Sequence, residues 1–191
     1  MGKIFYSLFF MGLVLSNMAF SVDYRPLSDQ EFKRCNSYFA DIEGHPLFVS
    51  YCSSGEIPDA FIKDKVKGMS INVFRFIDTL SLKRKESRTN ISLDIFEVTG
   101  DQLNDRRRFS AWHTMNPDSK PLWALYDPRA IEVSKSSIMI TDQGKEWNDI
   151  ILGHELSHYW FDRFGLEGSW GKDLESFAVD FETYMNEQDK K

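Results

Sequence analysis

The sequence predicts a single α+β domain, in which a small mixed or antiparallel sheet packs on two helices that carry candidate metal ligands. Three features indicate this: short apolar runs that alternate as strands do, longer runs with helical spacing, and the pattern H-E-x-x-H at His154–His158 followed by an acidic helix. The chain has 191 residues, 42% of them hydrophobic and 15% aromatic. This is enough for one globular domain with a core and too little for two.

Residues 1–21 are predicted to form a secretory signal peptide. A basic residue precedes the apolar run 4–15, which is too short to cross a bilayer but fits the central part of a signal sequence. Ala19 and Ser21 supply small residues for cleavage before Val22. An uncleaved membrane anchor is the alternative.

The remaining chain, residues 22–191, is predicted to be one exported domain, periplasmic or extracellular, without a stable membrane span. The formal net charge of −6 gives no support to a nucleic-acid partner. Two short basic clusters, at 83–85 and 106–108, lie near acidic residues and indicate a solvated surface. The oligomeric state stays open.

The chain contains two cysteines, Cys35 and Cys52. Export to an oxidising compartment favours a disulfide between them, and a pair of buried thiols is the alternative. A metal role is weakly indicated, because the spacing is not C-x-x-C.

Local patterns predict the elements of the first half of the chain. The capping box that begins at Ser28 starts a helix, which continues through Phe39 and turns Cys35 inward. Residues 46–52 read as a strand, so the disulfide would join this helix to this strand. Apolar residues spaced by three and four predict an amphipathic core helix over 62–80.

The second half predicts further strands and the helix that carries the motif. The expected segments are a strand over 91–100, a long surface loop over 101–122, short apolar runs at 122–126 and 130–133, and a strand at 137–141. The motif helix then runs from about Lys145 to Phe164. It ends at Gly165, a residue favoured after a helix C-terminus.

The motif itself predicts a metal site. His154 and His158 stand four residues apart, so on a helix both imidazoles reach one ion. Glu155 is rotated away from that ion but can reach a water bound to it. Apolar residues surround the motif nearly all round the helix, and buried polar groups need the compensation that an ion supplies. A catalytic Zn²⁺ requires a third protein ligand and one open position.

The third ligand is predicted to be Glu175, on the helix that follows a glycine-rich turn. Ala178, one turn later, would let this helix approach the motif helix closely. Its rivals are Glu182, Asp173, which is a candidate helix cap, and Asp180.

Other residues are candidates for supporting roles. Asp162 follows His158 by one turn, which suits a group that orients a histidine better than a ligand. A donor to the transition state is also expected. The candidates for it are Tyr159, His113, Tyr126 and Tyr184.

Taken together, His154-Glu155-x-x-His158 and Glu175-x-x-Ala178-x-x-Phe181 resemble the gluzincin zinc peptidases, in particular the small minigluzincin-like ones. The resemblance covers about residues 138–185. The metzincin continuation is excluded, because phenylalanines stand where its glycine and histidine would be.

The resemblance implies a zincin-like fold and a sheet whose edge strand binds an extended substrate. The strand at 138–141 or the one at 91–98 could take that place. Many of the small relatives are intracellular, whereas this chain carries a predicted signal peptide.

The function expected from these residues is that of a secreted zinc-dependent metallopeptidase, a hydrolase acting on protein or peptide. A Zn²⁺-activated water would attack the peptide carbonyl with Glu155 as general base. Two alternatives remain: an exported zinc-containing binding or interaction protein without proteolysis, and a cell-wall peptide hydrolase.

Overall fold

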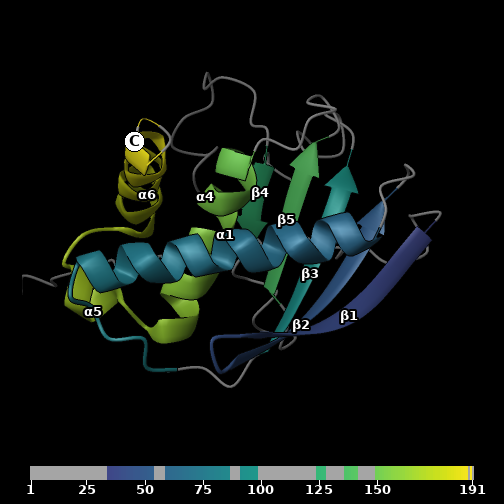
Figure 1. Ribbon diagram of the computed structural model, residues 1–191, viewed down its shortest axis with the longest axis horizontal. Helices are drawn as coiled ribbons and strands as arrows, with labels where there is room; N and C mark the ends of the chain where they lie inside the picture. Colours follow the sequence, from purple (N-terminus) through teal and green to yellow (C-terminus); the bar gives the residue numbers. More distant parts are fainter. Residues whose placement is uncertain are drawn as a thin grey trace, which may run out of the picture.

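The computed structural model describes residues 34–53, 59–86, 91–98, 124–127, 136–141, 149–188 and 190. Within these residues a five-stranded sheet packs against helices, which confirms the predicted α+β class (Figure 1). The strands are β1 (Arg34–Ile42), β2 (His45–Ser53), β3 (Ser92–Val98), β4 (Ala124–Asp127) and β5 (Ser136–Thr141). The helices are α1 (Asp59–Thr79), α4 (Asp149–Phe164), α5 (Glu167–Trp170) and α6 (Leu174–Gln188).

The sheet is mixed, with strand order β1-β2-β3-β5-β4. Strands β2, β3 and β5 run parallel, while β1 and β4 pair antiparallel at the two edges. Both strands that we expected at a substrate-binding edge, 91–98 and 138–141, are therefore internal, and that expectation is wrong. Pairing with β4, in which Tyr126 faces Ile138, moves β5 inside and makes β4 the edge beside α4.

Alternating residues of the sheet bury one face against the helices. Helix α1 crosses this face, and helix α4 lies between α1 and α6 (Figure 1). The predicted core helix over 62–80 is confirmed as α1, since its apolar positions from Ile62 to Phe76 are buried, while Leu80 follows the helix and is partly buried. Core side chains from the sheet and from α1 include Leu47, Val49, Leu93, Ile95, Ile138, Ile62, Val66 and Val73.

The predicted first helix is wrong in its described part, because residues 34–42 form β1. The four-residue step from Cys35 to Phe39 fits a helix, but Ala40 and Ile42 alternate into the core and pair with β2. Glu43 and Gly44, both with positive φ, close the hairpin between the two strands. The start of the predicted helix, from Ser28, lies outside the described residues.

The disulfide between Cys35 and Cys52 is confirmed. It joins residues that face each other on β1 and β2, rather than a helix and a strand as expected. Such a bond is compatible with export.

Several other expectations are settled by the described segments. The strands predicted at 46–52 and 137–141 are confirmed as β2 and β5, and the apolar run 122–126 overlaps β4. The strand predicted at 91–100 is confirmed as β3, while residues 99–100 lie outside the described part of the chain. Helix α4 ends where expected, with Gly165 at φ 62° just after it. None of the helices in the described ranges combines the length and apolar character needed to cross a bilayer.

The signal peptide, the loop over 101–122 and the apolar run 130–133 lie outside the described residues.

Candidate metal centre

Helix α4 brings the motif to the junction with α6 because one of its residues lacks a side chain. Gly153 is buried, and a Cβ added there would lie 2.8 Å from Cε1 of Phe181 and 3.3 Å from Sδ of Met69. The α6 backbone can therefore approach α4 closely at the turn that carries His154. On the core side, Nε1 of Trp160 donates to Oγ of Ser70 at 2.9 Å.

Three ligand atoms converge between α4 and α6. The Nε2 atoms of His154 and His158 lie 3.0 Å apart. Oε1 of Glu175 lies 3.5 Å from Nε2 of His154, and its Oε2 lies 3.4 Å from Nε2 of His158. Around a tetrahedral Zn²⁺, with bonds of about 2.0–2.2 Å, ligand atoms stand about 3.3–3.5 Å apart. The two contacts of Glu175 match this spacing, whereas the two imidazole nitrogens lie closer together than it. These three residues could therefore hold a metal ion.

The rival acids on α6 have other partners. Oε1 of Glu182 lies 2.8 Å from Nδ1 of His154, on the edge of the ring away from Glu175. Asp173 caps α6 by accepting a backbone N–H at 2.7 Å, as its predicted role requires. Asp180 pairs with a neighbouring lysine at 3.3 Å. Among these acids, Glu175 is the one that contacts both Nε2 atoms.

The charges at this cluster favour a cation. Burial lowers the pKa of His154, but the hydrogen bond with Glu175 and the charges of Glu155, Glu175 and Glu182 outweigh it and raise that pKa to about 9. Hydrogen bonds from the two histidines lower the pKa of Glu175. Three carboxylates thus surround two imidazoles, and this excess of negative charge would be offset by a divalent ion.

The general-base candidate, Glu155, is buried at 6% exposure. Burial raises the pKa of its carboxyl, although the charges of His158 and His154 oppose that rise. The carboxylate also accepts a hydrogen bond from the backbone N–H of Tyr126 on β4. Glu155 is therefore fixed between the motif helix and the edge strand.

Tyr126 makes two further contacts along α4. Its ring stacks on the ring of His158, with centroids 5.9 Å apart and planes inclined by 26°. Its hydroxyl donates to Oδ2 of Asp162 at 2.9 Å. Nδ1 of His158 is buried without a hydrogen-bond partner in the described part of the chain. Asp162 thus supports the tyrosine that covers His158, whereas we expected it to orient a histidine itself.

Two of the other candidate donors to the transition state, Tyr159 and Tyr184, contact residues outside the metal cluster. The hydroxyl of Tyr159 accepts a hydrogen bond from Nη1 of Arg163 at 3.2 Å. The ring of Tyr184 packs on the rings of Phe76 and Phe181. His113 lies outside the described residues.

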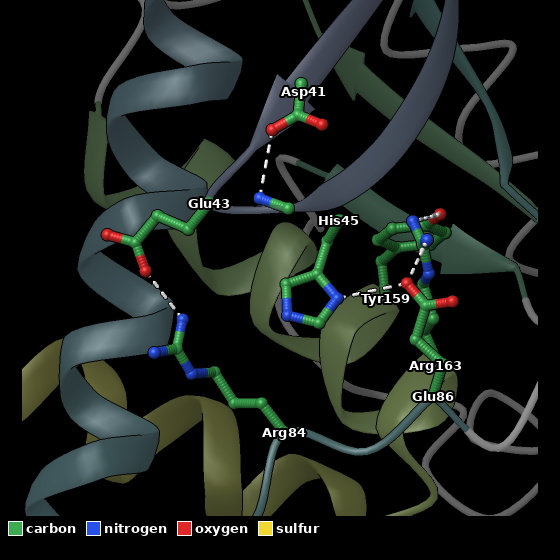
Figure 2. A network of polar contacts seen from close by, with 8 residues as sticks. Asp41, Glu43, His45, Arg84, Glu86, Tyr159 and Arg163 are labelled. Atoms are coloured by element: carbon green, nitrogen blue, oxygen red, sulfur yellow. Dashed lines mark hydrogen bonds and ion pairs between the residues drawn. The ribbon is translucent and has the colours of Figure 1, made fainter.

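A polar network anchors the C-terminal half of α4 (Figure 2). Glu86, after α1, accepts from Nη2 of Arg163 at 2.5 Å and lies 3.0 Å from Nδ1 of His45 at the start of β2. The guanidinium of Arg163 also stacks over the ring of Trp160, 4.9 Å from its centre. Nothing in the sequence pattern distinguished Arg163 from an exposed arginine, yet it is buried at 2% exposure.

No family model, no curated protein and no solved structure matches this chain.

Proposed function

We propose that this protein is an exported zinc-dependent metallopeptidase with a gluzincin-type site on a zincin-like fold. The observation that carries the proposal is the convergence of His154, His158 and Glu175, whose ligand atoms all lie within 4.8 Å of one another and could share one ion. Their neighbour Glu155 supplies a buried carboxylate next to that point. The disulfide between Cys35 and Cys52 is compatible with the exported location.

Each residue of the site has a role in peptide hydrolysis. His154, His158 and Glu175 would hold the ion. The bound Zn²⁺ supplies a Lewis acid and a water of lowered pKa. Glu155 accepts a proton from the attacking water and returns it to the leaving amine, and its raised pKa suits a group that both takes up and releases a proton.

The edge strand β4 supports an extended peptide as the substrate. It is the outer strand of the described sheet on the side of α4, and its Tyr126 touches both Glu155 and His158. A peptide that adds to this edge by backbone pairing would pass beside the metal cluster. We therefore propose β4, in place of β3 or β5, as the strand that would bind the substrate.

The test measures metal content and hydrolysis on the same purified exported protein. We expect about one zinc per chain, and cleavage of casein or a quenched peptide library that chelator abolishes. Glu155→Gln should keep the zinc and lose the cleavage, because it retains the ligands and removes the base. Metal-free protein, or full cleavage by this variant, would overturn the proposal. Zinc without cleavage would point to a binding protein, and cleavage of peptidoglycan peptides alone to a cell-wall hydrolase.

A further inference from the structure

The two histidines of the metal cluster are supported in different ways. Nδ1 of His154 lies 2.8 Å from Oε1 of Glu182. Nδ1 of His158 is buried and has no hydrogen-bond partner within the described residues, and the ring of Tyr126 packs on it instead. Glu182 therefore acts on one histidine of the pair.

When His154 binds an ion as a neutral imidazole, the contact with Glu182 decides which of its nitrogens keeps the proton. An ionised carboxylate can only accept, so Nδ1 must be the donor. In the neutral ring the lone pair then belongs to Nε2, the atom that faces His158 and Glu175. Glu182 thereby selects the tautomer in which His154 can bind the same ion as the other two residues.

Helix α6 holds His154 from both edges of its ring. Glu175 and Glu182 are separated by about two turns of α6, so their side chains project from the same face of this helix. Between them Phe181 packs against Gly153 of α4, which fixes the distance between the two helices. The imidazole of His154 lies between the two carboxylates, with one ring nitrogen facing each.

We propose that Glu182 is a positioning residue of the metal centre, which fixes the tautomer and the ring orientation of His154 without touching the ion. The inference rests on the metal centre of the proposed function, but not on peptide hydrolysis. Removal of such a hydrogen-bonded partner from a metal-binding histidine lowers metal affinity by about 10–100-fold.

The experiment measures the dissociation constant for Zn²⁺ by competition with a chromophoric chelator. Glu182→Ala should weaken binding by about 10–100-fold. Glu182→Gln should lose less, because its amide oxygen still accepts from Nδ1 of His154 and its shape is nearly unchanged. The matched control is Glu187→Ala, which removes the same charge from an exposed position of α6 and should bind as the wild type does.

Substitution with Co²⁺ distinguishes a positioning residue from a ligand. The visible absorption of the Co²⁺ form should keep its tetrahedral character in Glu182→Gln, while Glu175→Gln should change it. Wild-type Zn²⁺ affinity in Glu182→Ala would overturn the inference. It would also be overturned if Glu182→Gln changed the Co²⁺ spectrum as Glu175→Gln does, because Glu182 would then be a ligand.

Hydrolysis measured on the same preparations separates this inference from the proposed peptidase. Weaker zinc binding in Glu182→Ala, together with wild-type protein that cleaves no peptide, would support the inference and overturn the peptidase. Unchanged zinc binding in that variant, together with cleavage that depends on Glu155, would do the reverse.

Discussion

The hydroxyl of Tyr126 donates to the carboxylate of Asp162 at 2.9 Å, and this bond joins the edge strand β4 to the last turns of the motif helix α4. The same tyrosine stacks on His158, and its backbone N–H reaches Glu155. The bond therefore fixes β4 relative to both of these residues of the candidate site.

Tyr126→Phe should therefore loosen the contact between β4 and α4 without changing metal binding. The ring still covers His158, so zinc affinity should stay within about twofold, a change well below the effect of losing a hydrogen bond to a metal-binding histidine. The lost hydrogen bond to a carboxylate should lower the free energy of unfolding by about 1–2 kcal/mol. Peptide cleavage should fall as β4 loosens. Chemical denaturation and zinc competition check this, and unchanged stability together with unchanged cleavage would contradict it.

Gly153→Ala should destabilise the protein even though alanine favours a helix by about 1 kcal/mol over glycine. The new Cβ would lie 2.8 Å from the ring of Phe181, so α6 would have to move away and carry Glu175 with it. We expect a loss of about 1–3 kcal/mol and weaker zinc binding. The control is Gly168→Ala, where a Cβ meets nothing within 4 Å. Equal effects of the two substitutions on thermal stability would show that close approach at Gly153 is unimportant.

These contacts also show which parts of the fold and of the site could be predicted from the sequence alone. The helices with His154, His158 and Glu175 could be predicted, because their spacing is a property of each helix by itself. Strand β1 could not, since the step from Cys35 to Phe39 suits a helix or a strand and only pairing with β2 decides between them.

The roles of the supporting residues could not be predicted from the sequence for the same reason. In the sequence, Glu182 is a rival ligand and Tyr126 one of several candidate donors. The sequence does not show how β4, α4 and α6 pack against one another. Their contacts depend on the packing of elements that are distant along the chain.

Glu86→Gln should destabilise the protein in a pH-dependent way. Burial opposes the ionisation of Glu86, but the hydrogen bonds and charges of His45 and Arg163 outweigh it and lower its pKa below the ordinary 4.5. A lowered pKa in the folded state means stability that is present above pH 4.5 and is lost as the pH falls through the folded pKa.

At pH 7 the variant should lose about 1–3 kcal/mol, since the guanidinium of Arg163 is buried and loses its charged acceptor. The difference in unfolding free energy between wild type and variant should shrink below pH 4.5. A difference that stays constant down to pH 3, or grows there, would contradict this account of the network.

Loss of the disulfide should lower stability without removing the metal site. Cys35 and Cys52 are separated by 17 positions, and a loop of this size corresponds to about 3 kcal/mol in the chain-entropy description. The double variant Cys35→Ser, Cys52→Ser should therefore unfold at lower denaturant but still bind zinc, because the two cysteines pack with residues of β3 and β5, whereas the metal-ligand candidates lie on α4 and α6. Loss of zinc binding in the folded double variant would show that the hairpin supports the metal centre directly.

Anomalous diffraction at the zinc edge from crystals of the zinc-loaded protein tests the central claim most directly. The account predicts one strong peak about 2.0–2.2 Å from Nε2 of His154, Nε2 of His158 and a carboxylate oxygen of Glu175. A zinc ion bound away from these three atoms, or no zinc peak in protein soaked with the metal, would contradict it.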